Sequence, residues 1–237
     1  MPILVVIPGR SGDDLKIVVI IPALNEEAAI GRVVREIPPL ASKIIVVDNG
    51  SSDRTAERAR EAGAHVVHEE RKGYGYACLR GMAEVGDADV IVFLDGDYSD
   101  FPEEMGLLLE PIAADQADLV IGSRIRGRRE RGALLPHSFL ANILFSFALR
   151  LLCGLKVTDI GPFRAIKSDQ LFSLNMQEGT YGWTLEMMIN AAKRKLRVME
   201  VPVSYRKRIG HSKVSGSLWS SLKAAAKMIH TMVRYAL

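Results

Sequence analysis

The sequence of 237 residues has few cysteines and no leader-like segment. Its two cysteines, Cys78 and Cys153, are far apart and lie in apolar, helix-like surroundings. We therefore expect reduced thiols in a cytoplasmic protein rather than a disulfide. Residues 1–8 are apolar but short and lack a basic leader, so a secretory signal peptide is not expected.

Long apolar runs are also missing. No segment reaches the roughly 18 uninterrupted apolar residues that a membrane-spanning helix needs. The nearest candidate, residues 134–153, contains Pro136, His137, Asn142 and Arg150. Any membrane contact is therefore expected at the membrane surface.

Neither of the common glycine-rich phosphate motifs occurs. The pattern G-x-x-x-x-G-K-[ST] is absent, and Gly73-Tyr-Gly-Tyr76 lacks the third glycine and the preceding long strand of a dinucleotide-binding motif. A bound diphosphate would therefore need a metal ion and charged side chains.

The composition, with 48% hydrophobic and 25% charged residues, suits one globular α/β domain. The net charge of +3 is small, but positive side chains cluster in 124–131 and 205–208. These clusters favour an anionic partner. No aromatic residues interleave the first cluster, so nucleic acid is not the expected partner.

The most informative stretch is an apolar strand that runs into two carboxylates. Residues 90–94 are all apolar, as in a sheet covered on both faces, and Asp95 and Asp97 follow with only Gly96 between them. Two such carboxylates can bind one hard cation that keeps positions for water and phosphates. Gly96 would let a ligand approach the backbone. The pattern predicts a metal site for a diphosphate, although paired aspartates after a strand also form helix caps and turns.

Apolar runs alternate with amphipathic stretches through the first half of the chain. We expect strands at 17–22, 43–48, 64–68, 89–94 and 117–122, and helices at 26–37, 53–62, 76–85 and from 102. This alternation predicts an α/β fold with a mostly parallel central sheet covered by helices. Its ligands should bind at the carboxyl ends of the strands. Residues 196–205 read as a further strand, and helices should begin near 134, 183 and 218.

Polar side chains follow three of these strands. Asn25 and Glu26 follow the first strand, and Asp48 ends the second. Asp48 could accept a hydrogen bond from a base or ribose, whereas Asp53 could equally cap the next helix. Lys72 offers a cation near the same edge, or simply lies in a solvated loop.

The chain resembles family 2 glycosyltransferases of GT-A fold in five ordered motifs: Val-Ile-Ile-Pro-Ala-Leu-Asn-Glu-Glu, Ile-Val-Val-Asp-Asn-Gly-Ser-Ser-Asp, Arg-Lys-Gly-Tyr-Gly, Phe-Leu-Asp-Gly-Asp and Ile-Gly-Ser-Arg. The later segments 158–164 and 205–213 resemble the branch that contains dolichyl-phosphate mannosyltransferases and polyprenyl-phosphate glycosyltransferases. The resemblance covers about residues 17–215.

This resemblance implies roles for individual residues. Nucleotide-sugar contacts are expected from Pro22, Leu24, Glu26, Asp48, Lys72, Asp95, Arg208, Ser212 and Lys213. Catalytic roles are expected for Asp97, Arg124, Asp159, Arg164 and Glu186, and Mg²⁺ or Mn²⁺ would be bound by Asp95, Asp97 and Ser99. Ser99 stands where many members of the branch have glutamine, so water could complete the metal shell instead.

The acceptor is expected to be a lipid phosphate. A sugar hydroxyl needs a general base to remove its proton, whereas a phosphate is already anionic and needs cations. Arginines are abundant after residue 123 and carboxylates are scarce. Asp159 could act as a base, but a role in fixing Arg164 is favoured because arginine pairs well with carboxylate. Glu186 could lie near the sugar or only stabilise a helix N-terminus.

Two amphipathic segments, 134–153 and 216–237, remain. They could be core helices or a homodimer surface, but the neighbouring basic loops favour helices that lie at a bilayer interface. We therefore expect an N-terminal extension of uncertain role (1–14), a GT-A domain (15–215) and a C-terminal amphipathic helix (216–237).

The predicted activity is inverting transfer of a hexose from a UDP- or GDP-sugar to a polyprenyl phosphate. The protein would be peripheral, on the inner face of the membrane. The alternatives are the same fold acting on a soluble glycan or small molecule, and a non-catalytic subunit that binds a nucleotide sugar.

Overall fold

The computed structural model describes residues 15–210 and 218–236, and for 218–225 it describes the backbone only. The predicted extension 1–14 and the predicted ligands Ser212 and Lys213 lie outside the described residues.

A seven-stranded sheet forms the centre of the described chain, in the order β3-β2-β1-β4-β6-β5-β7. All neighbouring strands run parallel except β6, which is antiparallel to both β4 and β5. The prediction of a mostly parallel sheet is confirmed. The strands are β1 (Ile17–Ala23), β2 (Ala41–Asp48), β3 (His65–His68), β4 (Val90–Phe93), β5 (Leu119–Ser123), β6 (Arg164–Lys167) and β7 (Val198–Pro202).

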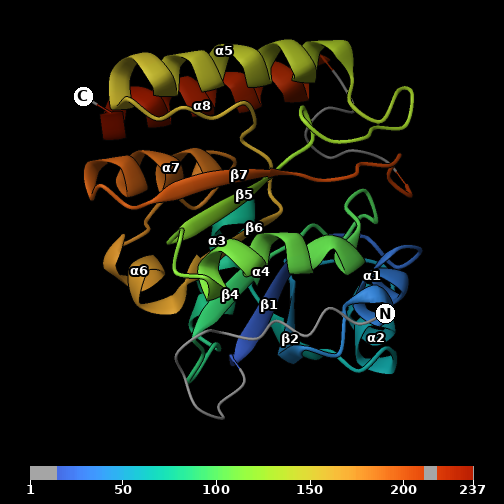
Figure 1. Ribbon diagram of the computed structural model, residues 1–237. Coiled ribbons are helices and arrows are strands. Elements are labelled where there is room, and N and C mark those ends of the chain that lie inside the picture. The colour runs from blue at the N-terminus through green and yellow to red at the C-terminus, as the bar shows by residue number, and fades with distance from the viewer. Residues whose placement is uncertain (1–14, 211–217, 237) are drawn as a thin grey trace.

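The central strands are apolar on both faces because helices cover both (Figure 1). Within β1, Val18 and Ile20 face one core, and Ile17, Val19 and Ile21 face the other. Every residue of β1 and β4 is buried, which is the pattern of a doubly covered sheet.

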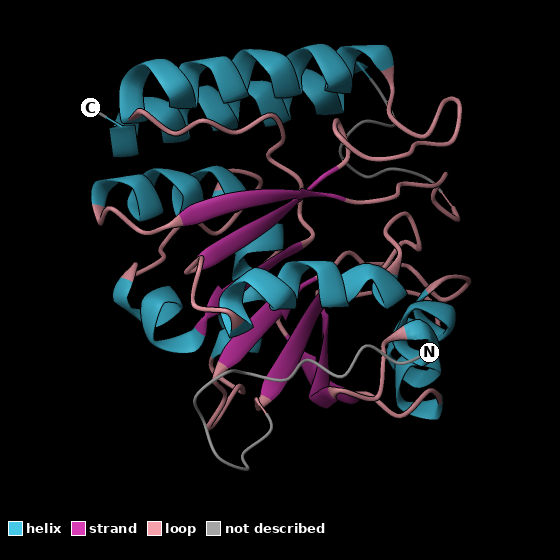
Figure 2. Cartoon of the chain, viewed as in Figure 1, coloured by secondary structure: helices cyan, strands magenta, loops and turns pink. Residues whose placement is uncertain are grey.

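The helices and helical turns fall into two layers (Figure 2). Side chains of α3, α5, α7 and α8 join one core, and those of α1, α2 and α4 join the other. Their bounds are α1 (Ile30–Glu36), α2 (Thr55–Glu61), α3 (Tyr74–Met82), η1 (Pro102–Glu104), α4 (Met105–Ala113), α5 (Pro136–Cys153), α6 (Ser168–Ser173), α7 (Trp183–Lys193) and α8 (Leu218–Ala236).

The sequence did not reveal β6 or α6. The four residues of β6 begin with arginine and end with lysine, so they lack the apolar run that marked the other strands. Because β6 is antiparallel, its first residue, Arg164, pairs with Phe93 and Ile121 near the carboxyl ends of β4 and β5. This reversal brings the start of β6 to the edge of the sheet where ligands are expected.

Helix α5 has two apolar sides, and only one of them is buried, where Phe145 and Leu149 join the core. Its apolar residues Leu140, Leu144, Phe147 and Leu151 are 57–72% exposed, whereas the polar Asn142 is buried. Among the described residues, α5 is the one helix long and apolar enough to cross a membrane, with a mean hydropathy of 1.3 and 22% of its 18 residues buried. One side of α5 therefore packs against the core, as the core-helix alternative expected, and the other side is exposed.

Candidate active site

A pocket of about 270 Å³ opens at the carboxyl ends of β1, β2 and β4. Its walls combine residues at and after the ends of these strands with residues from the start of α3 and from later loops: Pro22, Ala23, Leu24, Glu26, Asn49, Lys72, Gly73, Tyr74, Ala77, Asp95, Gly96, Asp97, Thr180, Tyr181 and Arg208. This is the edge at which open α/β sheets bind their ligands.

Seven of the predicted site residues line this pocket together, namely Pro22, Leu24, Glu26, Lys72, Asp95, Asp97 and Arg208. Lys72 is exposed in its loop, but its ammonium donates to the carbonyl of Gly50 at 2.8 Å and its side chain lines the pocket. The backbone N–H of Glu26 donates to Thr55 Oγ1 at 2.7 Å, which holds the turn after β1 against the start of α2.

Asp97 is positioned from two sides. The Ser99 hydroxyl and backbone N–H donate to Asp97 Oδ1 at 2.5 and 2.9 Å, and the Arg208 guanidinium lies 2.5 Å from Asp97 Oδ2. Burial and the neighbouring Asp97 raise the pKa of Asp95 to about 7, although Arg208 and Arg124 oppose that shift. The Ser99 hydroxyl orients Asp97, and its role as a metal ligand stays a prediction.

The paired aspartates offer the hard oxygen atoms that Mg²⁺ or Mn²⁺ prefers. The described residues contain no cluster of three His, Cys, Asp or Glu side chains with metal-binding geometry. A cation at Asp95 and Asp97 would therefore take its remaining ligands from phosphates and water, as Mg²⁺ usually does. Gly96 also has a packing role, since a Cβ there would lie 3.3 Å from Ile30 Cδ1 and 3.4 Å from the Pro22 carbonyl oxygen.

Asp48 lies behind the pocket and is not part of its lining. Its Oδ1 accepts from the backbone N–H of Ser51 at 3.1 Å, and its Oδ2 lies 3.1 Å from His68 Nδ1. Its neighbour Asn49 does line the pocket and joins it to the following loop. The Asn49 amide donates to the Arg71 carbonyl at 2.7 Å and accepts from the Gly73 N–H at 2.9 Å.

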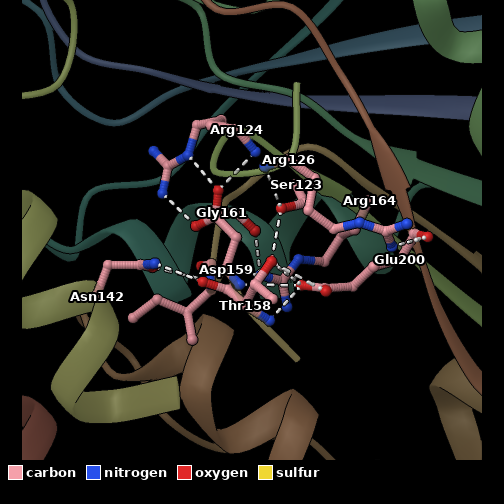
Figure 3. A network of polar contacts seen from close by, with 10 residues as sticks. Ser123, Arg124, Arg126, Asn142, Thr158, Asp159, Gly161, Arg164 and Glu200 are labelled. Atoms are coloured by element: carbon pink, nitrogen blue, oxygen red, sulfur yellow. Dashed lines mark hydrogen bonds and ion pairs between the residues drawn. The ribbon is translucent and has the colours of Figure 1, made fainter. Parts of the chain in front are cut away.

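Asp159 pairs with Arg124 and not with Arg164, so the prediction of its partner is wrong (Figure 3). The Arg124 guanidinium donates to both carboxylate oxygens at 2.7 and 2.9 Å, and the Arg124 backbone N–H adds a third bond at 2.8 Å. Asp159 is 0% exposed. The pair fixes the turn after β5, and the positive charge of Arg124 opposes the rise in the pKa of Asp95.

Arg164 is a buried structural residue and is not placed to contact a ligand directly. It is 0% exposed, and its guanidinium donates to the carbonyl groups of Thr184, Ile160 and Gly161. Burial lowers its pKa to about 10, so it stays charged at neutral pH. Its bonds tie β6 to the segment before it and to α7.

Glu186 is also fully buried, and the structure does not place it in the pocket lining. Its two carboxylate oxygens accept from the backbone N–H groups of Gln177 and Glu178 at 2.9 and 2.8 Å. Burial raises its pKa. Glu186 therefore shapes the loop that carries the pocket residues Thr180 and Tyr181.

The sequence did not indicate that Asn49, Tyr74, Thr180 and Tyr181 line the pocket. Asn49 stood inside a recognised motif, next to Asp48, so it could have been found. Thr180 and Tyr181 lie between two helices that are far from the aspartates in the sequence, and only the packing of the loop against residues 73–76 brings them there.

The chain is similar to several known proteins. Residues 18–172 match the model of the family described as glycosyl transferase family 2. The chain is 34% identical over 206 residues to a dolichyl-phosphate hexose transferase of Haloferax volcanii, which covers 85% of this chain and 87% of the relative. It is 32% identical over 226 residues to an undecaprenyl-phosphate mannosyltransferase of Micrococcus luteus, covering 86% and 89%.

A solved structure shows the same fold. Glucosyl-3-phosphoglycerate synthase of Mycobacterium tuberculosis, in complex with Mn²⁺, UDP and glucosyl-3-phosphoglycerate, superposes with a TM-score of 0.74 and 27% identity. The superposition covers 94% of this chain and 80% of the synthase. The predicted GT-A fold is confirmed, and the predicted divalent metal agrees with the Mn²⁺ of that complex. The chain belongs to glycosyl transferase family 2.

Proposed function

We propose that this protein transfers a hexose from a UDP- or GDP-sugar to a polyprenyl phosphate, with inversion at the anomeric carbon. The single observation that carries the proposal is the pocket in which Asp95, Asp97 and Arg208 meet at the carboxyl edge of the sheet. It combines a metal-binding carboxylate pair with a cation for the diphosphate.

The donor would enter the pocket with its nucleoside against Pro22, Leu24 and Glu26, and its diphosphate toward Asp95, Asp97 and Arg208. Lys72 supplies a second cation in the same wall. A divalent ion bound here would neutralise negative charge on the departing nucleoside diphosphate. Arg208 would stabilise the same charge through hydrogen bonds to phosphate oxygens.

In the proposed reaction, a phosphate oxygen of the acceptor attacks the anomeric carbon from the face opposite the diphosphate. One carbon–oxygen bond forms as the other breaks, and the bonding electrons leave with the nucleoside diphosphate. No proton has to be removed from an anionic phosphate. This agrees with the geometry, because Asp159 and Glu186, the two carboxylates considered as bases, are both held by hydrogen bonds within the protein.

The names of the relatives support a polyprenyl phosphate as acceptor, since two are transferases to dolichyl or undecaprenyl phosphate. The exposed apolar face of α5 supports a reaction at the membrane surface, where such an acceptor resides.

A second candidate is transfer to a soluble phosphorylated acceptor. It is favoured by the fold shared with glucosyl-3-phosphoglycerate synthase, whose structures include a complex with phosphoglyceric acid. That acceptor would need the same cations but no membrane.

One experiment tests both candidates. The purified protein is incubated with UDP- and GDP-hexoses, Mn²⁺ or Mg²⁺, and either a short polyprenyl phosphate or phosphoglyceric acid. We expect a glycosylated polyprenyl phosphate that forms only with metal. Transfer to phosphoglyceric acid alone would establish the second candidate, and metal-dependent binding of a nucleotide sugar without transfer to either would indicate a non-catalytic subunit.

A further inference from the structure

Helices α5 and α8 lie side by side at one end of the molecule (Figure 1). Together they expose an apolar surface, which we call the α5–α8 face. Its members are Leu140, Ile143, Leu144, Phe147, Leu151 and Leu152 of α5 and Ile229 and Val233 of α8, which are 43–72% exposed. Exposed apolar residues gathered on two adjacent helices mark an interaction surface.

The charges of this face favour an anionic lipid surface as its partner. Neither α5 nor α8 contains an aspartate or glutamate. Exposed arginines accompany the apolar residues, at Arg150 of α5 and Arg234 of α8. In the loop before α5, Arg128, Arg129 and Arg131 lie exposed around a single glutamate, Glu130. An apolar helix face with cations and without anions is the pattern of helices that lie in the interface of an anionic bilayer.

The inner side of α8 is bonded to the wall of the donor pocket. Lys227 of α8 lies 3.4 Å from Glu178 Oε1, and the Thr231 hydroxyl donates to Glu178 Oε2 at 3.4 Å. Glu178 in turn accepts from the N–H and hydroxyl of Thr180, at 3.1 and 2.7 Å. Thr180 and its neighbour Tyr181 line the pocket. One buried carboxylate thus connects α8 to the pocket wall.

Close backbone contacts hold this loop on both sides. A Cβ at Gly182 would overlap Thr231 of α8, and a Cβ at Gly75, on the opposite side, would overlap the carbonyl of Glu178. Because these contacts leave no free space around the loop 178–182, a shift of α8 would also shift the loop. Burial raises the pKa of Glu178, but its bonds to Thr180 and the charge of Lys227 outweigh that effect, so its pKa is lowered and the carboxylate is charged at neutral pH.

We propose that the α5–α8 face binds an anionic bilayer and that this binding strengthens nucleotide binding through Glu178, which transmits the position of α8 to Thr180 and Tyr181. This inference rests on the proposed donor pocket. The bilayer would restrict α8 to one position, and the nucleotide would bind a pocket whose wall is already in place. Such coupling is reciprocal, so the nucleotide should also strengthen vesicle binding.

The test measures the dissociation constant of UDP or GDP with Mn²⁺ by titration calorimetry. It is done in solution, with vesicles of phosphatidylcholine, and with vesicles that also contain phosphatidylglycerol. We expect the full chain to bind the anionic vesicles and to bind the nucleotide at least about fivefold more tightly on them than in solution. Phe147→Glu should abolish both effects. Phe172→Glu, a matched control that changes a 50% exposed phenylalanine on α6, should abolish neither.

Two further variants test the link itself. Glu178→Gln and Lys227→Met should bind anionic vesicles as the unaltered protein does, while the ratio of nucleotide affinities on vesicles and in solution falls to about one. Lys227 is on the helix surface, so its variant remains informative if Glu178→Gln does not fold.

Three outcomes would overturn the inference. Vesicle binding without any change in nucleotide affinity removes the coupling, and an unchanged ratio in both link variants removes Glu178 as its carrier. Failure to bind vesicles, together with dimerisation that Phe147→Glu abolishes, would make a second copy the partner of the face. If the unaltered protein binds neither UDP nor GDP even in solution, that result would instead contradict the proposed function.

Discussion

Asp97 is held by a serine on one carboxylate oxygen and by an arginine on the other, so its orientation does not depend on the ligand alone. Replacing it with asparagine keeps the size but removes the charge that would bind a cation. We expect Asp97→Asn to lower the rate of sugar transfer at least about 100-fold, since such preorganised charges are worth that much.

The measurement is the initial rate of transfer at saturating Mn²⁺. Asp87→Asn is the matched control, because Asp87 is an exposed aspartate paired with Lys16 at the surface, and it should keep full activity. Turnover by Asp97→Asn at the normal rate, or by the unaltered protein in metal-free buffer, would contradict the proposed role of the aspartate pair.

The ion pair between Asp159 and Arg124 predicts a loss of stability on substitution. Asp159→Asn would leave the buried Arg124 without its counter-charge, and breaking one side of a buried pair costs about 3–5 kcal/mol. We expect the denaturant midpoint to fall accordingly, with the same Asp87→Asn variant unchanged. An equal midpoint for Asp159→Asn and the unaltered protein would show that the pair contributes no stability.

The same pair predicts a pH dependence. Burial raises the pKa of Asp159, but Arg124 and its hydrogen bonds outweigh that effect and lower the pKa below the usual 3.8. Because the pKa of Asp159 is lower in the folded than in the unfolded state, its charge contributes fully to the free energy of unfolding above pH 3.8. This contribution is lost as the pH falls below that value. Chemical denaturation from pH 7 to pH 3 should therefore show an acid-induced loss that is smaller in Asp159→Asn.

At this scale the sequence predicted which residues gather at the site better than it predicted their partners. The aspartates and Arg208 were found because each stands in a short motif. The partner of Asp159 was not found, since Arg124 lies 35 positions away and Arg164 only five, and distance along the chain says little once β5 and β6 pair side by side.

Among the elements, α3 shows how closely a helix can approach the sheet. A Cβ at Gly81 would lie 2.5 Å from Ile20 Cγ2 and 3.1 Å from Val47 Cγ2. We expect Gly81→Ala to destabilise the protein by about 1–3 kcal/mol, because an added methyl has no room in a packed core. Thermal denaturation measures the effect.

A second helical glycine provides the control. A Cβ added at Gly106 of α4 would have no heavy atom within 4 Å, so alanine fits there without contact. Gly106→Ala should stabilise by up to about 1 kcal/mol, since alanine favours the helix. If both variants were equally stable, helix propensity rather than packing against β1 would govern Gly81.

Elements whose apolar residues follow one simple pattern could be predicted from the sequence. Elements that combine buried polar residues with apolar ones could not. Strands β1, β2, β4 and β5 were evident as apolar runs. Helix α5 was visible too, but its sequence could not tell which face turns inward. The buried face carries Phe145 and Leu149 together with Asn142, which donates to the Thr158 carbonyl at 2.8 Å and accepts from the Ile160 N–H at 3.0 Å.

At the scale of the molecule, the pocket needs both ends of the described chain. The family match ends at residue 172, yet Thr180, Tyr181 and Arg208 complete the pocket. Trp183, also beyond the match, is fully buried against Phe93, with ring centroids 4.7 Å apart. The described residues after the family match are therefore part of the same structural unit as the aspartate motif.

Arg206 joins three distant parts of the molecule around that motif. It donates to the Tyr98 carbonyl at 2.7 Å and to Glu36 of α1 at 2.9 Å, and it stacks 3.3 Å from the centroid of the Tyr98 ring. Tyr98 directly follows Asp97 and has a positive φ of 68°, a conformation that few residues other than glycine adopt. The contacts with Arg206 and Glu36 hold this strained turn in place.

Arg206→Met should therefore weaken both the fold and the site. Loss of its charged hydrogen bonds should cost about 2–3 kcal/mol of stability, and the loosened turn should raise the KM for the nucleotide sugar about tenfold with a smaller change in kcat. Lys207→Met is the control, because Lys207 is exposed beside it. A stability loss with an unchanged KM would mean that Arg206 supports the fold without positioning Asp97, since only a shift of the aspartate turn changes how tightly the donor is held.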